Sequence, residues 1–173
     1  MATIIIQKGC LLIAHPQMED EFFEKKIILL VEYNTNGALG FILNNKPSHT
    51  IADATDDFGT ETKFPIYNAG PMGEFDIHFV HTNPHLIGNG IDLGNGLFWN
   101  GNNEDVLAAL NKKLISENEL KFFHGYCGWD EGLLEQEIAE QSWIVCKANA
   151  GLVMNKDTSK IWDECLELIE YKI

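Results

Sequence analysis

Arginine is missing from this sequence of 173 residues, so its twelve basic residues are all lysines, set against 26 acidic ones. The formal net charge of −14 indicates an acidic surface, whereas binding of duplex DNA depends on neutralising phosphates with lysine and arginine. Without arginine the chain also lacks the residue that most often makes a specific contact to guanine. The composition therefore argues against direct binding of nucleic acid, and we interpret the charge as a source of solubility.

Cysteine is sparse and dispersed. The sequence has four cysteines, at positions 10, 127, 146 and 165. No two of them form the Cys-x-x-Cys pair of zinc ribbons or thioredoxin-like proteins. Because three of them stand in apolar stretches, we predict reduced, buried cysteines that serve packing.

Long hydrophobic runs are absent as well. No apolar stretch approaches the ~20 residues that a membrane helix needs. Residues 1–8 contain only three consecutive strong hydrophobes and no basic region before them, which does not fit a secretory signal. We therefore expect a cytoplasmic protein without membrane contact.

The common catalytic signatures do not occur in the sequence. It has no Gly-x-Ser-x-Gly elbow, no Walker A loop, no dinucleotide-binding Gly-x-Gly-x-x-Gly before a helix and no His-Glu-x-x-His. Active sites also assemble from distant segments, so an enzyme is not excluded. The sequence favours a protein that is not an enzyme and that carries neither cofactor nor metal.

The length fits a single domain over residues 1–173, and apolar runs alternate with turn residues along it. Strands are expected at 9–14, 26–33, 38–44, 64–67, 76–81, 97–99, 120–127 and 143–146, and helices at 103–115, after residue 130 and at 158–172. Residues 34–37 predict a hairpin with a four-residue loop, and residues 48–63 indicate a short helix or an irregular excursion. Strands come mostly before helices, which favours an α+β fold.

Residues 125–139 are the most informative segment. They predict the end of a buried strand, a turn at Gly128–Trp129 and an amphipathic helix that places Glu137 on its apolar face. A carboxylate on an apolar face must be paired or protonated. Glu137 is therefore either a general acid or base with a raised pKa or a hydrogen-bonded support for the turn, and we favour the support.

Several segments occur together in one order. They are Pro16–Phe22, Asn34–Asn44 with Lys46–Pro47, Gly70–Pro71, Val80–His81, Gly125–Trp129, Gly132–Ile138 and Trp143. In these segments the chain resembles the bacterial AlgH/YqgE family over about residues 9–171. The resemblance implies an α+β fold with a bifurcated mixed β-sheet, a small barrel-like part and surrounding helices. It also implies a suggested role in transcriptional regulation, and it implies no reaction.

Four further residues complete the candidate site. His81 matches the family pattern, although a metal site with His78 is disfavoured because the two histidines of one strand point to opposite faces. Trp129 is the tryptophan best placed to line a groove. The loop from Asn34 to Gly37 is a candidate recognition edge, with plain turn chemistry as the favoured alternative.

These observations lead to two function hypotheses. The first is a regulatory or interaction protein that acts through contacts with a protein or a small molecule. The second is an enzyme, for example a hydrolase, with Glu137 and His81 near a cleft beside Trp129. The second hypothesis requires Glu137, His81 and the Asn34 loop to meet in one concave pocket.

Overall fold

Strand β9 organises the structure, because parts of the sheet on both sides of it pair with its backbone. The computed structural model describes residues 4–169. Within them the strands are β1 (Cys10–Ala14), β2 (Ile27–Asn34), β3 (Gly37–Ile42), β4 (His49–Thr50), β5 (Pro65–Asn68), β6 (Met72–His81), β7 (Ile91–Gly94), β8 (Leu97–Trp99), β9 (Leu120–Asp130) and β10 (Trp143–Lys147). The helices are α1 (Ile51–Ala54), α2 (Asn103–Asn111), α3 (Leu133–Ala139), α4 (Ala150–Val153) and α5 (Ile161–Leu168).

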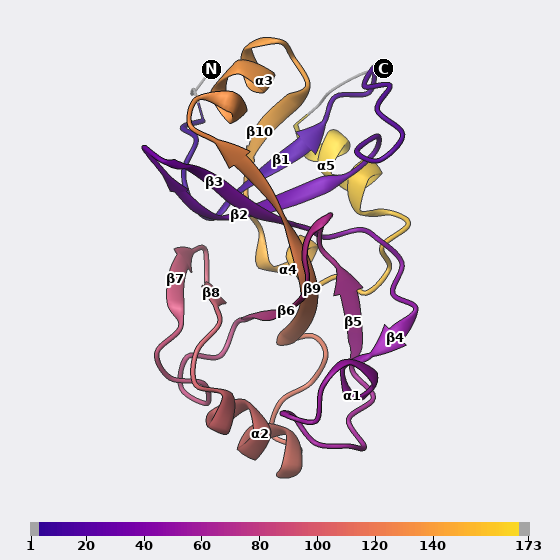
Figure 1. Ribbon diagram of the computed structural model, residues 1–173, viewed down its shortest axis with the longest axis vertical. Helices are drawn as coiled ribbons and strands as arrows, with labels where there is room; N and C mark the ends of the chain where they lie inside the picture. Colours follow the sequence, from indigo (N-terminus) through magenta and orange to yellow (C-terminus); the bar gives the residue numbers. More distant parts are fainter. Residues whose placement is uncertain (1–3, 170–173) are drawn as a thin grey trace.

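The sheet has the order β10-β1-β2-β3-β9-β6-β8-β7, and β5 adds a second branch to β9. In its first half β9 pairs in parallel with β5 and antiparallel with β6, so that Phe122 faces a partner on each side. In its second half β9 pairs antiparallel with β3. Figure 1 shows β9 running through the middle of the molecule, from the level of β5 and β6 toward α3. The expected α+β fold with a bifurcated mixed sheet is confirmed.

The sheet curls into a half-barrel, and its two ends approach each other near residue 9. A Cβ atom added to Gly9 would lie 1.8 Å from the carbonyl oxygen of Leu93 on β7. Gly9 also has φ +90°, which favours glycine at this position. The backbone before β1 therefore meets the last strand at the other end of the sheet directly.

Strands β1 and β2 are buried on both faces, which explains their continuous apolar runs. On β1, Leu11 and Ile13 belong to the core cluster that α4 and α5 cover. Leu12, one residue along, belongs to a second cluster with Trp129 and Trp143 beside α3. A third cluster lies between the sheet and α1 and α2. Figure 1 shows α3 at one end of the long axis and α2 at the other.

Two local predictions near the motif are wrong. The hairpin between β2 and β3 has a loop of only residues 35–36, because Asn34 pairs with Gly37. Gly128–Trp129 is not a turn, since β9 continues to Asp130 and Trp129 pairs with Ala38 of β3. The chain instead turns just beyond Asp130 and enters α3 through Gly132, whose φ is +79°.

The predicted helices begin close to their expected positions but end earlier. Helix α2 ends at Asn111, so residues 112–115 of the predicted helix lie outside it. Helix α5 spans Ile161–Leu168, and the predicted residues 170–172 fall outside the part of the chain that the structure describes. No helix among residues 4–169 has the length and apolar character needed to cross a membrane.

Candidate functional site

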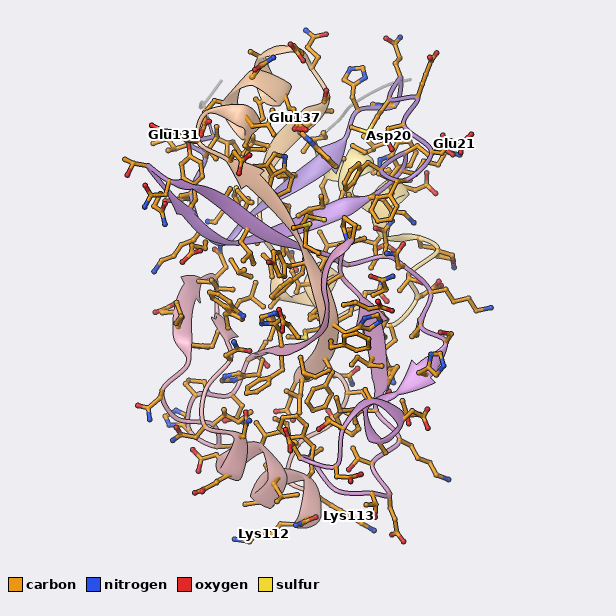
Figure 2. The ribbon with its side chains drawn as sticks, viewed as in Figure 1. Asp20, Glu21, Lys112, Lys113, Glu131 and Glu137 are labelled. Atoms are coloured by element: carbon orange, nitrogen blue, oxygen red, sulfur yellow. The ribbon has the colours of Figure 1, made fainter. Side chains whose placement is uncertain are left out.

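Trp129 and Glu137 are joined by a hydrogen bond between β9 and α3. The indole Nε1–H of Trp129 donates to the Glu137 carboxylate, at 2.9 Å from Oε2. The Glu137 side chain is half-buried, and Figure 2 places it at the α3 end of the molecule. Trp129 is buried and packs edge-on against Trp143, with 6.4 Å between ring centroids. This geometry fits the interpretation of Glu137 as a structural support, here for the end of a strand.

Asn34 and Gly37 form the base of the β2–β3 hairpin and touch the same region. The side-chain Oδ1 of Asn34 accepts a hydrogen bond from the backbone N–H of Asn36 at 2.8 Å, which is turn chemistry. A Cβ atom at Gly37 would lie 2.1 Å from the carbonyl oxygen of Trp129, and φ at Gly37 is +138°. Only glycine allows β3 and β9 to approach this closely here.

A second side-chain bond ties the hairpin to α3. The Tyr33 hydroxyl donates to the carboxylate of Glu135, and this bond is the main cause that raises the pKa of Tyr33 to about 12. The hairpin, the end of β9 and α3 thus form one unit. It contains four of the five residues singled out from the sequence: Asn34, Gly37, Trp129 and Glu137.

His81 lies elsewhere, at the end of β6, and is fully buried. Its Nε2–H donates to the carbonyl oxygen of Asn100 at 3.1 Å, and its Nδ1 accepts from the backbone N–H of Asn83 at 3.2 Å. The ring also stacks on Phe98, with centroids 5.6 Å apart. Burial lowers the pKa of His81, although the two backbone bonds oppose that shift. His81 is therefore a neutral imidazole whose two nitrogens are both engaged with backbone.

The register of β9 gives the separation between His81 and the other candidates. His81 lies opposite Leu120 at the start of β9, whereas Ala38 lies opposite Trp129 near its end. At roughly 3.3 Å per residue, these positions are up to about 30 Å apart along the strand. The structure does not bring His81 together with Glu137 and Trp129.

Two other groups that suggested chemistry are also part of the core. The Cys127 thiol lies 3.5 Å from the carbonyl oxygen of Ala69, and burial raises the pKa of this thiol to about 12. A thiol with such a pKa is a poor nucleophile near neutral pH. His78 lies against the Phe41 ring at 4.9 Å, and burial lowers its pKa. Among residues 4–169, no group of three or more histidine, cysteine or acidic side chains is placed to hold a metal ion.

Lys121 on β9 was missed by the sequence analysis. Its side chain is only 4% exposed, and its ammonium donates to the carbonyl oxygens of Leu43, Val153 and Asn155 at 3.3, 3.1 and 3.3 Å. It also lies 4.4 Å from the centre of the Tyr67 ring. Desolvation lowers the pKa of Lys121 to about 7. The available signal was a lysine inside the most apolar strand of the sequence.

The second missed feature is a bulge on β6, which we call the Phe75 bulge and define as residues 72–76. Met72 pairs with Tyr126 and Ile77 pairs with His124, so residues 73–76 stand opposite Gly125 alone. Extra residues on one strand of a pair are forced out of the sheet. Phe75 at the tip is 88% exposed, and Met72 is 52% exposed. An aromatic flanked by Glu74 and Asp76 was the only sequence signal.

The bulge borders a hollow of about 320 Å³ that β4, α1, β5, β6 and β9 surround. The hollow is lined by His49, Asp53, Ala54, Ile66, Glu74, Phe75, Ile77 and His124. It lies away from the hairpin and α3, because its strand contacts are made by the first half of β9.

The sequence is similar to a group of related bacterial proteins. A family model described as AlgH-like matches residues 11–173. A UPF0301 protein from Chlorobaculum tepidum is 32% identical over 158 residues, covering 91% of this chain and 84% of that protein. A UPF0301 protein from Parabacteroides distasonis is 29% identical over 172 residues, covering 95% and 85%.

Two solved structures are similar to this one in fold. The solution structure of the AlgH protein from Pseudomonas aeruginosa has a TM-score of 0.77 at 24% identity and covers 99% of this chain and 93% of its own. The crystal structure of the protein DIP2367 from Corynebacterium diphtheriae has a TM-score of 0.75 at 22% identity, with 97% and 90% covered.

Proposed function

This chain belongs to the AlgH-like family, and we propose that it is a non-catalytic cytoplasmic protein that binds another protein through the Phe75 bulge. The observation that carries the proposal is the exposure of Phe75, at 88%, beside Met72, at 52%. Large aromatic and methionine side chains are enriched at protein interfaces. Exposing them together favours a surface that a partner covers.

The bulge is held in place by specific contacts. His124 on β9 donates through Nδ1 to the carbonyl oxygen of Glu74 at 3.2 Å. Gly73 has φ +53°, and a Cβ atom there would lie 2.5 Å from the Tyr126 ring. A surface that is already ordered loses less conformational entropy when a partner binds. This anchoring supports a binding role for the bulge.

The buried and half-buried ionisable groups that could take part in catalysis have structural partners instead. His81 is bonded to two backbone groups, Glu137 to an indole and Lys121 to three carbonyls. These contacts favour the interaction hypothesis over the hydrolase hypothesis. The four buried free cysteines fit a reducing compartment such as the cytoplasm. Any effect on transcription would then pass through a protein partner, because the acidic chain repels duplex DNA.

The test is a site-specific photocrosslink in living cells. The photoreactive residue p-benzoylphenylalanine replaces Phe75 in one variant and Leu168 in a control variant, since Leu168 is also apolar and 61% exposed on α5. We expect a discrete crosslinked protein from position 75 and none from position 168. No product from position 75, or the same products from both positions, would contradict the proposal.

A further inference from the structure

The hollow beside the Phe75 bulge combines an apolar lining with negative charge. Ala54, Ile66 and Ile77 supply the apolar part, together with Phe75 at the border of the hollow. Its volume of about 320 Å³ is at the small end of the range for ligand pockets, about 300–1,000 Å³. The hollow therefore suits one extended side chain better than a large cofactor.

The ionisable residues of the lining are two carboxylates, Asp53 and Glu74, and two histidines, His49 and His124, and among residues 4–169 no lysine lines the hollow. The Asp53 carboxylate accepts from the backbone N–H of Thr50 at 2.9 Å and from its hydroxyl at 3.1 Å. These two bonds lower the pKa of Asp53 and fix its position at the start of α1. Asp76 adds a third exposed acid next to Phe75. A ligand for this hollow meets negative charge together with apolar surface.

We propose that the hollow binds a lysine or arginine side chain of a basic segment in a protein partner, while a neighbouring apolar residue of that segment packs on Phe75 and Met72. The inference rests on the proposed function and adds the chemistry of the partner. The aliphatic stem of such a side chain suits the apolar lining. Its cationic head suits the two carboxylates and the face of an aromatic ring.

Charge complementarity selects a basic partner over the other occupants. A second copy of this chain would bring its own charge of −14 to an acidic surface, and like charges repel. Nucleic acid is disfavoured for the same reason. A small organic cation would fill the hollow but leave Phe75 and Met72 uncovered. A protein segment accounts for both the acidic hollow and the exposed apolar side chains.

The test uses nuclear magnetic resonance titrations of the full chain with two short peptides. The first probe is the blocked peptide Gly-Leu-Arg-Arg-Gly, and the second replaces both arginines with citrulline, which keeps the shape and removes the charge. We expect saturable chemical-shift changes at residues 49–54 and 74–77 with the arginine peptide. The dissociation constant of the citrulline peptide should be at least several-fold larger. Raising the salt concentration should lower the affinity of the arginine peptide, because salt screens the attraction between charges.

Two matched variants locate the charge effect. Glu74→Gln should lower the affinity for the arginine peptide about two- to five-fold, the size expected for one exposed ion pair. Glu131→Gln removes the same charge at the α3 end of the molecule, where Figure 2 places Glu131, and should leave the affinity unchanged. Equal weakening by both variants, or no shift change at residues 49–54 and 74–77, would overturn the inference.

Further outcomes separate this inference from the proposed function. If both peptides bind with equal affinity, the positive charge does not contribute to recognition. Binding is then through apolar contacts, and the inference fails. If spermidine produces the same shifts with equal affinity, the occupant is a small cation, and the inference also fails. In these cases a crosslink at position 75 but not at position 168 would still support binding of a protein. Absence of that crosslink would contradict both the proposed function and the inference.

Discussion

The ammonium of Lys121 lies inside the protein, where only 4% of this residue is exposed. Moving an ammonium from water into the interior of a protein costs several kcal/mol unless polar groups replace the lost water. In this fold the carbonyl oxygens of Leu43, Val153 and Asn155 take that role for Lys121. Val153 is the last residue of α4 and Asn155 follows the C-cap, so both carbonyls lie near a helix end, where unpaired carbonyls carry partial negative charge. Lys121 therefore fastens β9 to α4 and to the chain just after β3.

Lys121→Met should abolish a pH dependence of stability. In the folded protein burial lowers the pKa of Lys121 to about 7 from the ordinary 10.5, so above pH 7 the unfolded chain binds more protons than the folded one. The free energy of unfolding contributed by this group therefore rises with pH, by at most ~1.4 kcal/mol per unit. Urea denaturation between pH 6 and 8.8 measures the free energy of unfolding of both proteins. As the pH rises, this free energy should increase more for the wild type than for Lys121→Met.

The control for this experiment is Lys112→Met, which removes the same charge from an exposed residue after α2. Its free energy of unfolding should run parallel to that of the wild type over the whole pH range. A Lys121→Met curve that is also parallel to the wild type would show that this ammonium does not titrate near neutral pH.

The bond between Trp129 and Glu137 gives a second prediction for single residues. Glu137→Ala leaves the buried indole N–H without its acceptor and should lower the free energy of unfolding by about 1–2 kcal/mol. Glu137→Gln keeps a carbonyl oxygen in reach and should cost less. Urea denaturation followed by tryptophan fluorescence measures both, with Glu131→Ala as a surface control. An equal cost for Glu137→Ala and Glu131→Ala would contradict the structural role of this bond.

Among the elements, β6 and β9 form the pair with the largest departure from a regular ladder. The register shift places residues 73–76 opposite Gly125, and this mismatch pushes Phe75 outward. Gly125 has φ +74°, and a Cβ atom there would lie 2.6 Å from the carbonyl oxygen of Gly70. The shape of the Phe75 bulge thus depends on a glycine in the neighbouring strand.

Gly125→Ala should destabilise the protein more than the same change at a roomy glycine. Both Gly125 and Gly132 have positive φ, at +74° and +79°, but a Cβ atom at Gly132 meets nothing within 4 Å. Gly132→Ala should therefore cost about 1 kcal/mol, the penalty for φ alone, whereas Gly125→Ala adds a backbone clash. Thermal unfolding ranks the two variants, and equal melting temperatures would show that the backbone at Gly70 and Met72 shifts freely to admit the methyl group.

At the scale of the molecule, β9 makes the two ends of the long axis depend on each other. Its first half carries the cluster beside α1 and α2, and its second half carries the cluster beside α3. Phe123 stacks on Phe41 of β3, with centroids 5.2 Å apart, and so links the two branches of the sheet. Figure 2 shows Lys112 and Lys113 at one end of the molecule and Asp20, Glu21 and Glu131 at the other.

We therefore predict that the chain unfolds as one cooperative unit. Native-state hydrogen exchange tests this, because amides that open only on global unfolding share one free energy of opening. The most protected amides of residues 120–124 should match those of residues 126–130. A clearly smaller value in either half would indicate that the two branches of the sheet open separately.

The sequence by itself determined eight of the ten strands of residues 4–169 and the α+β class, because apolar patterns depend on neighbouring side chains along the chain, but it missed the short β4 and β7. The apolar run of β2 and the Asn-Gly signals of its hairpin are such local features. It also determined that Glu137 faces inward, since helical periodicity sets that direction. It placed strand ends less well: β9 continues past Gly128 only because β3 supplies a partner for its backbone.

The tertiary structure alone decided which residues meet. His81 on β6 and Trp129 on β9 are both strand residues, and only the pairing of β6 with the start of β9 places His81 far from Trp129 near the other end of β9. Lys121 became a buried cation because Leu43, Val153 and Asn155 converge on it from distant positions. Phe75 became exposed because β6 is longer than the stretch of β9 that it pairs with. These features depend on contacts between residues far apart in the sequence, which periodicity and composition do not encode.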